Sequence, residues 1–194
     1  PPHYAYLMTS DGCDNACTFC SIPGFRGAFR SKSRAEVLQE ARELIASGTL
    51  ELNLISQDLT DWGKDLDGEG GLASLLRDVA ALDGLRWVRM LYAYPGHVDD
   101  DLLDAMRDLP TVVPYLDIPI QHISTEVLKR MGRRHTREET RTLLERLRAQ
   151  VPGIVIRTTF ICGFPGSTEG DFQELLEFVK EFRFERLGVF PYSH

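Results

Sequence analysis

The chain contains 194 residues, of which 43% are hydrophobic, and it carries a formal net charge of −7 and four cysteines. This length and apolar content suit one domain with a single core, and the negative charge argues against a domain that grips a nucleic-acid backbone. No apolar run reaches the ~18–20 residues of a membrane-spanning helix, and few cysteines without a signal peptide indicate a reducing cytoplasm rather than disulfides.

Patterns typical of strands and helices alternate along the chain. Short apolar runs bounded by turn residues predict strands at residues 4–8, 50–56, 87–92, 115–120, 154–162 and 187–190. Apolar residues at helical spacing predict helices from Ser33 to Gly48, from Leu72 to Gly84, from Asp99 to Leu109, after Ser124, from Thr136 to Pro152, and after Gly166. Ser33 and Thr136 open capping boxes, and Asp99 and Ser124 are the expected caps of their helices.

This alternation predicts an α/β fold with right-handed βαβ units and one parallel sheet. A closed barrel of eight such units usually takes ~250 residues, so six units are better explained by an open, partial six-stranded (β/α)6 barrel. A doubly wound open sheet is the alternative. In both architectures ligands bind at the carboxyl ends of the strands, and the loop after the first strand lies there.

That loop contains three of the four cysteines, Cys13, Cys17 and Cys20, in the spacing C-x3-C-x2-C. Thiolates this close in sequence can converge on one soft metal centre. Zinc ions and iron–sulfur cubanes usually take four protein ligands, so three cysteines without a near fourth favour a centre with one open position. The alternatives are a structural zinc site completed by a histidine or Cys162, and three unrelated buried thiols.

With an aromatic residue, Phe19, before the last cysteine, this spacing resembles the cluster-binding loop of the radical S-adenosylmethionine (SAM) superfamily. The resemblance implies that Cys13, Cys17 and Cys20 hold three irons of a 4Fe–4S cluster, while the amino and carboxylate groups of SAM bind the fourth. It also implies a partial barrel, cleavage of SAM to a 5′-deoxyadenosyl radical, and an electron donor such as flavodoxin or ferredoxin.

SAM bound in this way needs protein partners for its carboxylate, hydroxyls and adenine. Arg157 is the expected carboxylate partner, because an arginine on a strand expected to be buried needs a paired charge; a structural ion pair is the alternative. Gln57 and Gln121 follow two strands and offer both a donor and an acceptor. The other expected cofactor-binding residues are Phe19 near the adenine, Thr159 on the fifth strand and Gly163 at its end.

Further segments resemble the methylthiotransferase branch of the superfamily: Gln57, residues 119–122 and residues 160–169. Within it, Ser56-Gln57-Asp58, Tyr94-Pro95, residues 115–119 and Tyr192-Ser193 are similar to members that add a methylthio group to the β-carbon of an aspartate in a small-subunit ribosomal protein. Members that modify adenosine in tRNA are the alternative, and they would be expected to carry Gly-Gln-Asn in place of Ser56-Gln57-Asp58.

Both ends of the sequence suggest a piece of a longer chain, since it begins with Pro1-Pro2 and closes at His194 directly after an expected strand. Members of this branch carry an N-terminal domain with a second cluster and a C-terminal TRAM domain that docks the substrate. We therefore expect residues 1–194 to be the radical SAM core domain alone, able to bind a cluster and SAM but incomplete for the full reaction.

Two further features are ambiguous. The most basic segment, residues 129–135, is expected to be a solvated helix end, where positive charge suits the helix dipole. His97 and His122 are either pocket residues or hydrogen-bonded structural histidines.

Overall fold

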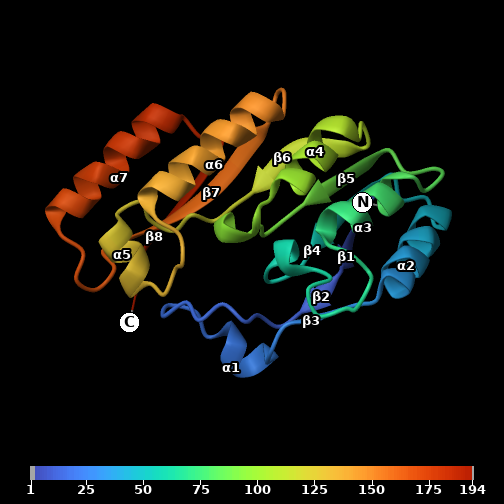
Figure 1. Ribbon diagram of the computed structural model, residues 1–194, viewed down its shortest axis with the longest axis horizontal. Coiled ribbons are helices and arrows are strands. Elements are labelled where there is room, and N and C mark those ends of the chain that lie inside the picture. Colours follow the sequence, from blue (N-terminus) through green and yellow to red (C-terminus); the bar gives the residue numbers. More distant parts are fainter. Residues whose placement is uncertain (1–2, 194) are drawn as a thin grey trace.

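Six parallel strands form one sheet in the computed structural model of the chain, in the order β1-β4-β5-β6-β7-β8 (Figure 1). The strands are β1 (Tyr4–Met8), β4 (Glu51–Ile55), β5 (Trp87–Met90), β6 (Val112–Asp117), β7 (Val155–Cys162) and β8 (Arg186–Pro191). The structure describes residues 3–193, so the expectation for the chain ends at Pro1, Pro2 and His194 lies outside the described residues.

Helices follow most of these strands and pack against the sheet. They are α2 (Arg34–Ala46), α3 (Leu72–Ala80), α4 (Asp100–Asp108), α5 (Thr125–Arg130), α6 (Arg137–Gln150) and α7 (Glu169–Phe182). Figure 1 shows α4, α6 and α7 on one side of the sheet, and the cysteine loop with the short helix α1 (Ile22–Arg26) on the other. No helix among residues 3–193 is long and apolar enough to cross a membrane.

The sheet stays open, because no pairing joins β8 back to β1 within residues 3–193. The predicted α/β fold with a six-stranded parallel partial barrel is therefore confirmed. The parallel order brings the carboxyl ends of all six strands to one edge, so loops that are far apart in sequence meet there.

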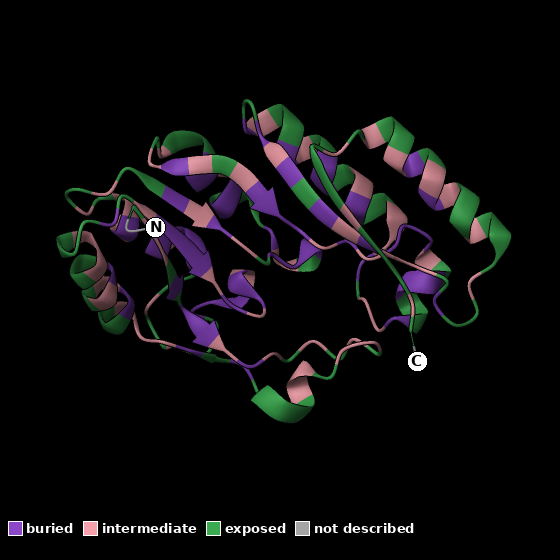
Figure 2. Cartoon of the chain, turned by 180° about the vertical axis from the view of Figure 1, so that it is seen from behind, coloured by how far each residue is buried: buried purple, intermediate pink, exposed green. Residues whose placement is uncertain are grey.

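Buried and more accessible residues alternate along strand β7, so its two faces differ in burial (Figure 2). Ile156, Thr158 and Phe160 are buried, and the ring centroid of Phe160 lies 6.5 Å from that of Phe178 on α7. Burying an aliphatic or aromatic side chain of this size contributes about 1.5–3 kcal/mol. The alternate residues Arg157 and Thr159 face the concave side, where they are more accessible.

The strand expected at residues 115–120 was misplaced, since β6 spans Val112–Asp117. Ile118 and Ile120 are buried as the apolar run predicted, but Pro119 between them has no N–H to donate to a neighbouring strand. Gln121 then adopts φ +73°, which ends the regular strand.

The capping predictions were correct except at one helix. Ser33 and Thr136 form capping boxes, and the Asp99 carboxylate accepts from the backbone N–H of Leu102 at 2.9 Å. Ser124 stands at the N-cap position of α5 as predicted, but its hydroxyl makes no capping bond and instead donates to Asp171 Oδ1 of α7 at 2.6 Å.

The apolar pattern of the sequence does not predict the short elements that frame the cysteine loop. Before the loop lies β2 (Ser10–Asp11), and after it come α1 and β3 (Arg30–Ser31), which pairs antiparallel with β2. These elements have too few residues to show an apolar period, and α1 has no buried residue. Two hydrogen bonds close the base of the cysteine loop: Cys13 N–H donates to the backbone oxygen of Gly27 at 3.2 Å, and Phe29 N–H donates to the Asp14 side chain (Oδ1) at 2.9 Å.

The far end of the cysteine loop rests on the turn that follows α5. Thr18 N–H donates to Met131 O at 3.0 Å, and the Thr18 hydroxyl donates to Arg130 O at 2.9 Å. Gly132 in this turn has φ +71°, and a Cβ built on it would lie 2.4 Å from Ala16 O. Only glycine combines this backbone angle with so close an approach of the loop.

We predict that Gly132→Ala loosens the cysteine loop. Its cost should be the left-handed backbone penalty of roughly 1–2 kcal/mol plus about 1–3 kcal/mol for the steric overlap with Ala16. The matched control is Gly153→Ala, which shares a positive φ (+73°) but whose Cβ would meet nothing within 4 Å. Urea unfolding and hydrogen exchange at the Thr18 amide measure the effect; equal losses of stability and unchanged Thr18 protection would contradict it.

Candidate functional site

A pocket of about 340 Å³ lies at the carboxyl ends of the strands, beneath the cysteine loop. The residues predicted for the site that line it are Cys13, Cys17, Cys20, Phe19, Gln57, Gln121, Arg157 and Thr159. Gly163 is the exception, since it is exposed and the chain turns away there with φ +73°. Pocket-lining residues that sequence analysis did not propose include Asn15, Tyr92, Tyr94 and Arg133.

The three cysteines are half-buried, and none forms a disulfide. Cys13 Sγ accepts a hydrogen bond from the backbone N–H of Asn15 at 3.4 Å. Burial raises the pKa of the Cys13 thiol, so it stays protonated at neutral pH until a metal displaces the proton.

These sulfurs are not gathered into a preformed zinc site. Three thiolates on one tetrahedral zinc, with bonds of about 2.3 Å, lie roughly 3.8 Å apart. Among residues 3–193, the only group of three side chains whose possible ligand atoms lie within 4.8 Å of one another is Asp58, Asp61 and His97. Thiolates that bind three different irons of a cubane need no such close approach, so the three cysteines that line the pocket are compatible with a cluster.

One polar atom of the pocket wall has no partner of its own. Gln57 Oε1 is buried and accepts no hydrogen bond within residues 3–193. A buried acceptor without a donor costs free energy, so its presence beside the cysteines suits a ligand that carries an amine or a hydroxyl. SAM offers both groups, and this part of the pocket therefore fits it.

Arg157 lies in the pocket as predicted, but its side chain is not buried within the sheet as expected. Its strand is buried only on the helix side, and the Arg157 side chain is 44% exposed on the concave side. Its Nη1 donates to Oδ2 of the buried Asp117 at 2.6 Å. Burial raises the pKa of Asp117, while the positive charge of Arg157 acts in the opposite direction. The structural ion pair is present, and the guanidinium still faces the pocket.

Two pocket residues hold an unusual backbone conformation. Tyr92 (φ +67°) and Gln121 (φ +73°) follow β5 and β6, and neither is glycine. Each such residue costs of order 1–3 kcal/mol and persists only where its surroundings fix it. Tyr92 O accepts from Leu59 N–H at 3.0 Å, and Gln121 N–H donates to Thr159 O at 2.8 Å. Strain of this kind is typical of binding sites.

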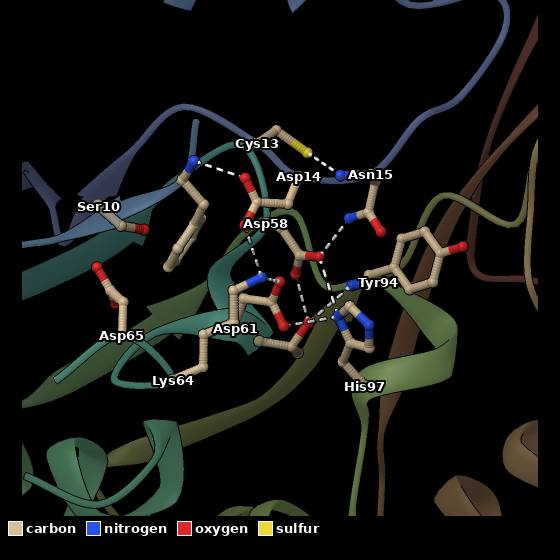
Figure 3. Close-up of polar contacts among 12 residues, drawn as sticks. Ser10, Cys13, Asp14, Asn15, Asp58, Asp61, Lys64, Asp65, Tyr94 and His97 are labelled. Carbon is tan, nitrogen blue, oxygen red and sulfur yellow. Dashed lines mark hydrogen bonds and ion pairs between the residues drawn. The ribbon is translucent and has the colours of Figure 1, made fainter. Parts of the chain in front are cut away.

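An ion-pair network behind the pocket anchors the cysteine loop (Figure 3). Asn15 Nδ2 donates to Oδ2 of the buried Asp58 at 2.7 Å. His97, in the 3-10 helix η2 (Pro95–His97), lies 3.1 Å from Asp58 and 2.9 Å from Asp61 of η1 (Leu59–Asp61). Hydrogen bonds to Asp58 and then Asp61 raise the pKa of His97 to about 9, so the ring is charged at neutral pH and donates to these carboxylates.

The structure accounts for both ambiguous histidines. His97 belongs to the network and does not line the pocket. His122 is buried, its Nδ1 accepts from Ser124 N–H at 3.1 Å, and burial lowers its pKa. Both are hydrogen-bonded structural residues.

We predict that the stabilising contribution of His97 disappears at alkaline pH. Its folded pKa of about 9 exceeds its ordinary value of 6.5, so the contribution is complete below about pH 6.5 and is lost as the pH rises through 9. The difference in unfolding free energy between wild type and His97→Gln should fall from about 1–3 kcal/mol near pH 6 to near zero by about pH 10. A difference that stays constant over this range would refute the charged network.

The sequence matches the Radical SAM superfamily over residues 7–179. The chain is 54% identical over 193 residues to "Ribosomal protein uS12 methylthiotransferase RimO" of Geotalea uraniireducens, a match that covers 99% of this chain and 43% of the relative. The protein of the same name from Geobacter sulfurreducens is 53% identical over 193 residues, covering 100% of this chain and 43% of the relative. The chain thus spans less than half the length of these curated relatives.

Solved structures show the same fold at low sequence identity. TsrM from Kitasatospora setae, a radical S-adenosylmethionine methyltransferase solved with cobalamin and a 4Fe–4S cluster, has a TM-score of 0.76 and 19% identity over 97% of this chain and 36% of its own. Coproporphyrinogen III oxidase (HemN) from Escherichia coli, a radical SAM enzyme, has a TM-score of 0.67 and 20% identity over 100% of this chain and 45% of its own. Together with the match over residues 7–179, the partial barrel and its cysteine loop lead to one conclusion: the chain belongs to the Radical SAM superfamily.

Proposed function

We propose that this chain is the radical SAM core of a methylthiotransferase that modifies an aspartate of ribosomal protein uS12 at its β-carbon. The observation that carries the proposal is the pocket in which Cys13, Cys17 and Cys20 lie together with Gln57, Gln121 and Arg157. Relatives named for this activity, 54% and 53% identical across nearly the whole chain, support the choice of substrate.

In this proposal Cys13, Cys17 and Cys20 would hold a 4Fe–4S cluster. When bound and reduced, that cluster would supply the electron for cleavage of SAM to methionine and a 5′-deoxyadenosyl radical. The chain's own contribution is to place three thiols at one pocket beneath the cysteine loop, where a metal can displace their protons.

The remaining pocket residues orient SAM. Arg157 keeps its pair with Asp117 and offers its other guanidinium nitrogens to the SAM carboxylate, as charge-assisted donors. Gln57 Oε1 accepts from the SAM amino group, and Gln121 meets a ribose hydroxyl. Phe19 and Thr159 lie against the nucleoside, whereas Gly163 serves only to turn the chain after β7.

We expect substrate docking to require further domains of a longer protein, and electron supply to require a separate protein. A TRAM domain would present the ribosomal protein, an N-terminal domain would hold the second cluster, and a flavodoxin or ferredoxin would reduce the core. The chain's net charge of −7 is unfavourable for RNA, so this domain alone is not expected to bind nucleic acid. We place the reaction in the reducing cytoplasm, where an air-sensitive cluster survives.

We predict that Cys17→Ala abolishes cluster binding while Cys162→Ala does not. Anaerobic reconstitution of the wild-type chain should give a brown protein with about four irons and matching sulfide. Cys17→Ala should lose the colour, the iron and the cleavage of SAM. Cys162 is the matched control, because it is also partly buried but lies outside the pocket.

Metal and sulfide analysis measures the outcome of this experiment. One zinc per chain without sulfide would identify the structural zinc alternative. Retention of about four irons by Cys17→Ala would contradict the ligand assignment.

The substrate is tested with the full-length protein that carries this chain. In cells lacking its gene, mass spectrometry of uS12 should show the target aspartate without its methylthio group, and restoring the gene should restore the group. Restoration with a Cys17→Ala copy should fail. An unmodified tRNA adenosine together with an unaffected uS12 would instead assign the protein to tRNA modification.

A further inference from the structure

Arg133 is a pocket residue that the sequence did not single out. Residues 129–135 were expected to be a solvated helix end, but the Arg133 side chain turns inward and lines the pocket. Its Nη1 lies 3.8 Å from Cys17 Sγ, and its Nη2 donates to Pro119 O at 2.6 Å. Among residues 3–193, it is the only charged group that hydrogen-bonds a sulfur of the cysteine loop.

The guanidinium is held on its other sides by two rings. It stacks over Tyr94, with the guanidinium carbon 4.2 Å from the ring centroid. Its Nε donates to His135 Nε2 at 3.3 Å. These contacts, together with Pro119 O, leave little freedom to a side chain that is normally mobile.

The surroundings of His135 fix the direction of that last hydrogen bond. The Thr140 hydroxyl donates to Thr136 O at 2.8 Å, so it accepts from His135 Nδ1–H at 2.9 Å. This tautomer leaves Nε2 as an acceptor for Arg133. Burial, and then the charge of Arg133, lower the pKa of His135 to about 4, so the ring is neutral at physiological pH and does not repel the guanidinium.

A fixed positive charge beside a cluster ligand has a defined effect. Reduction adds one negative charge to a cluster and its thiolates, and a cation or an N–H donor at a ligand sulfur stabilises that charge. In a partly desolvated pocket this stabilisation exceeds that of the same charge in water. Such a donor therefore raises the reduction potential.

We propose that Arg133 is a positioning residue that hydrogen-bonds the Cys17 thiolate and raises the reduction potential of the bound cluster. The inference rests on the proposed function, because it requires a cluster on Cys13, Cys17 and Cys20. Tyr94, Pro119 and His135 act through Arg133 by holding its guanidinium at the sulfur.

The test is a redox titration of the anaerobically reconstituted chain, followed by electron paramagnetic resonance of the reduced cluster. Arg133→Gln should lower the equilibrium constant for reduction at least tenfold, which for one electron is about 59 mV toward negative potential. Arg133→Lys, which keeps the charge but cannot hold both Pro119 O and Cys17 Sγ, should shift the potential less in the same direction. The matched control is Arg134→Gln, because Arg134 is exposed and its loss changes the charge equally; it should shift the potential least.

Iron content and urea unfolding are measured on every variant, so that the potential is compared only between loaded, folded proteins. Wild-type potentials in both loaded Arg133 variants would overturn the inference alone. Loss of SAM binding at an unchanged potential would also overturn it, since Arg133 would then be a SAM ligand. A wild-type chain that takes up no iron–sulfur cluster would overturn the proposed function as well.

Discussion

The site depends on the docking of a mainly irregular loop onto a turn more than a hundred residues away in sequence. At its base the cysteine loop is tied by Gly27 and Phe29, and at its far end Thr18 is bonded to Met131 and Arg130. Loop closure over such a separation is costly in entropy, so it requires a specific partner surface. The left-handed Gly132 supplies that surface by allowing the two backbones to touch. Without this contact the three cysteines would still lie in one loop, but that loop would not be held over the pocket.

The open sheet provides the edge over which the cysteine loop lies. Because all six strands are parallel, the residues that follow β4, β5, β6 and β7 converge on one edge. Ion pairs then offset the buried charges: Arg157 pairs with the buried Asp117, and His97 and Lys64 together face Asp58 and Asp61. The second of these networks reaches the cysteine loop through Asn15. The pocket is thus prepared by interactions that involve no ligand, which reduces the reorganisation needed when one binds.

The apolar periodicity and the capping residues of the sequence predicted most of the fold. They could not predict contacts between segments that lie far apart in the sequence. Apolar periodicity located five of the six strands and the longer helices, placed β6 three residues too late, and the capping boxes at Ser33 and Thr136 were correct. The capping bond predicted for Ser124 is missing, because a serine hydroxyl can either cap its own helix or donate to another helix, here to Asp171. Arg133 was missed because a basic segment after a helix resembles a solvated end unless the loop it contacts is known. The left-handed Tyr92 and Gln121 carry no signal in a single sequence.

We propose that Cys13, Cys17 and Cys20 together hold one iron–sulfur cluster in this pocket. The decisive measurement is a crystal structure of the chain grown without oxygen, with anomalous diffraction measured on both sides of the iron absorption edge. We expect one compact group of iron sites bonded to all three sulfurs, with one iron free of protein ligands and facing Gln57 and Arg157. A single zinc site, or cysteine side chains turned away from one another around a metal-free pocket, would contradict it.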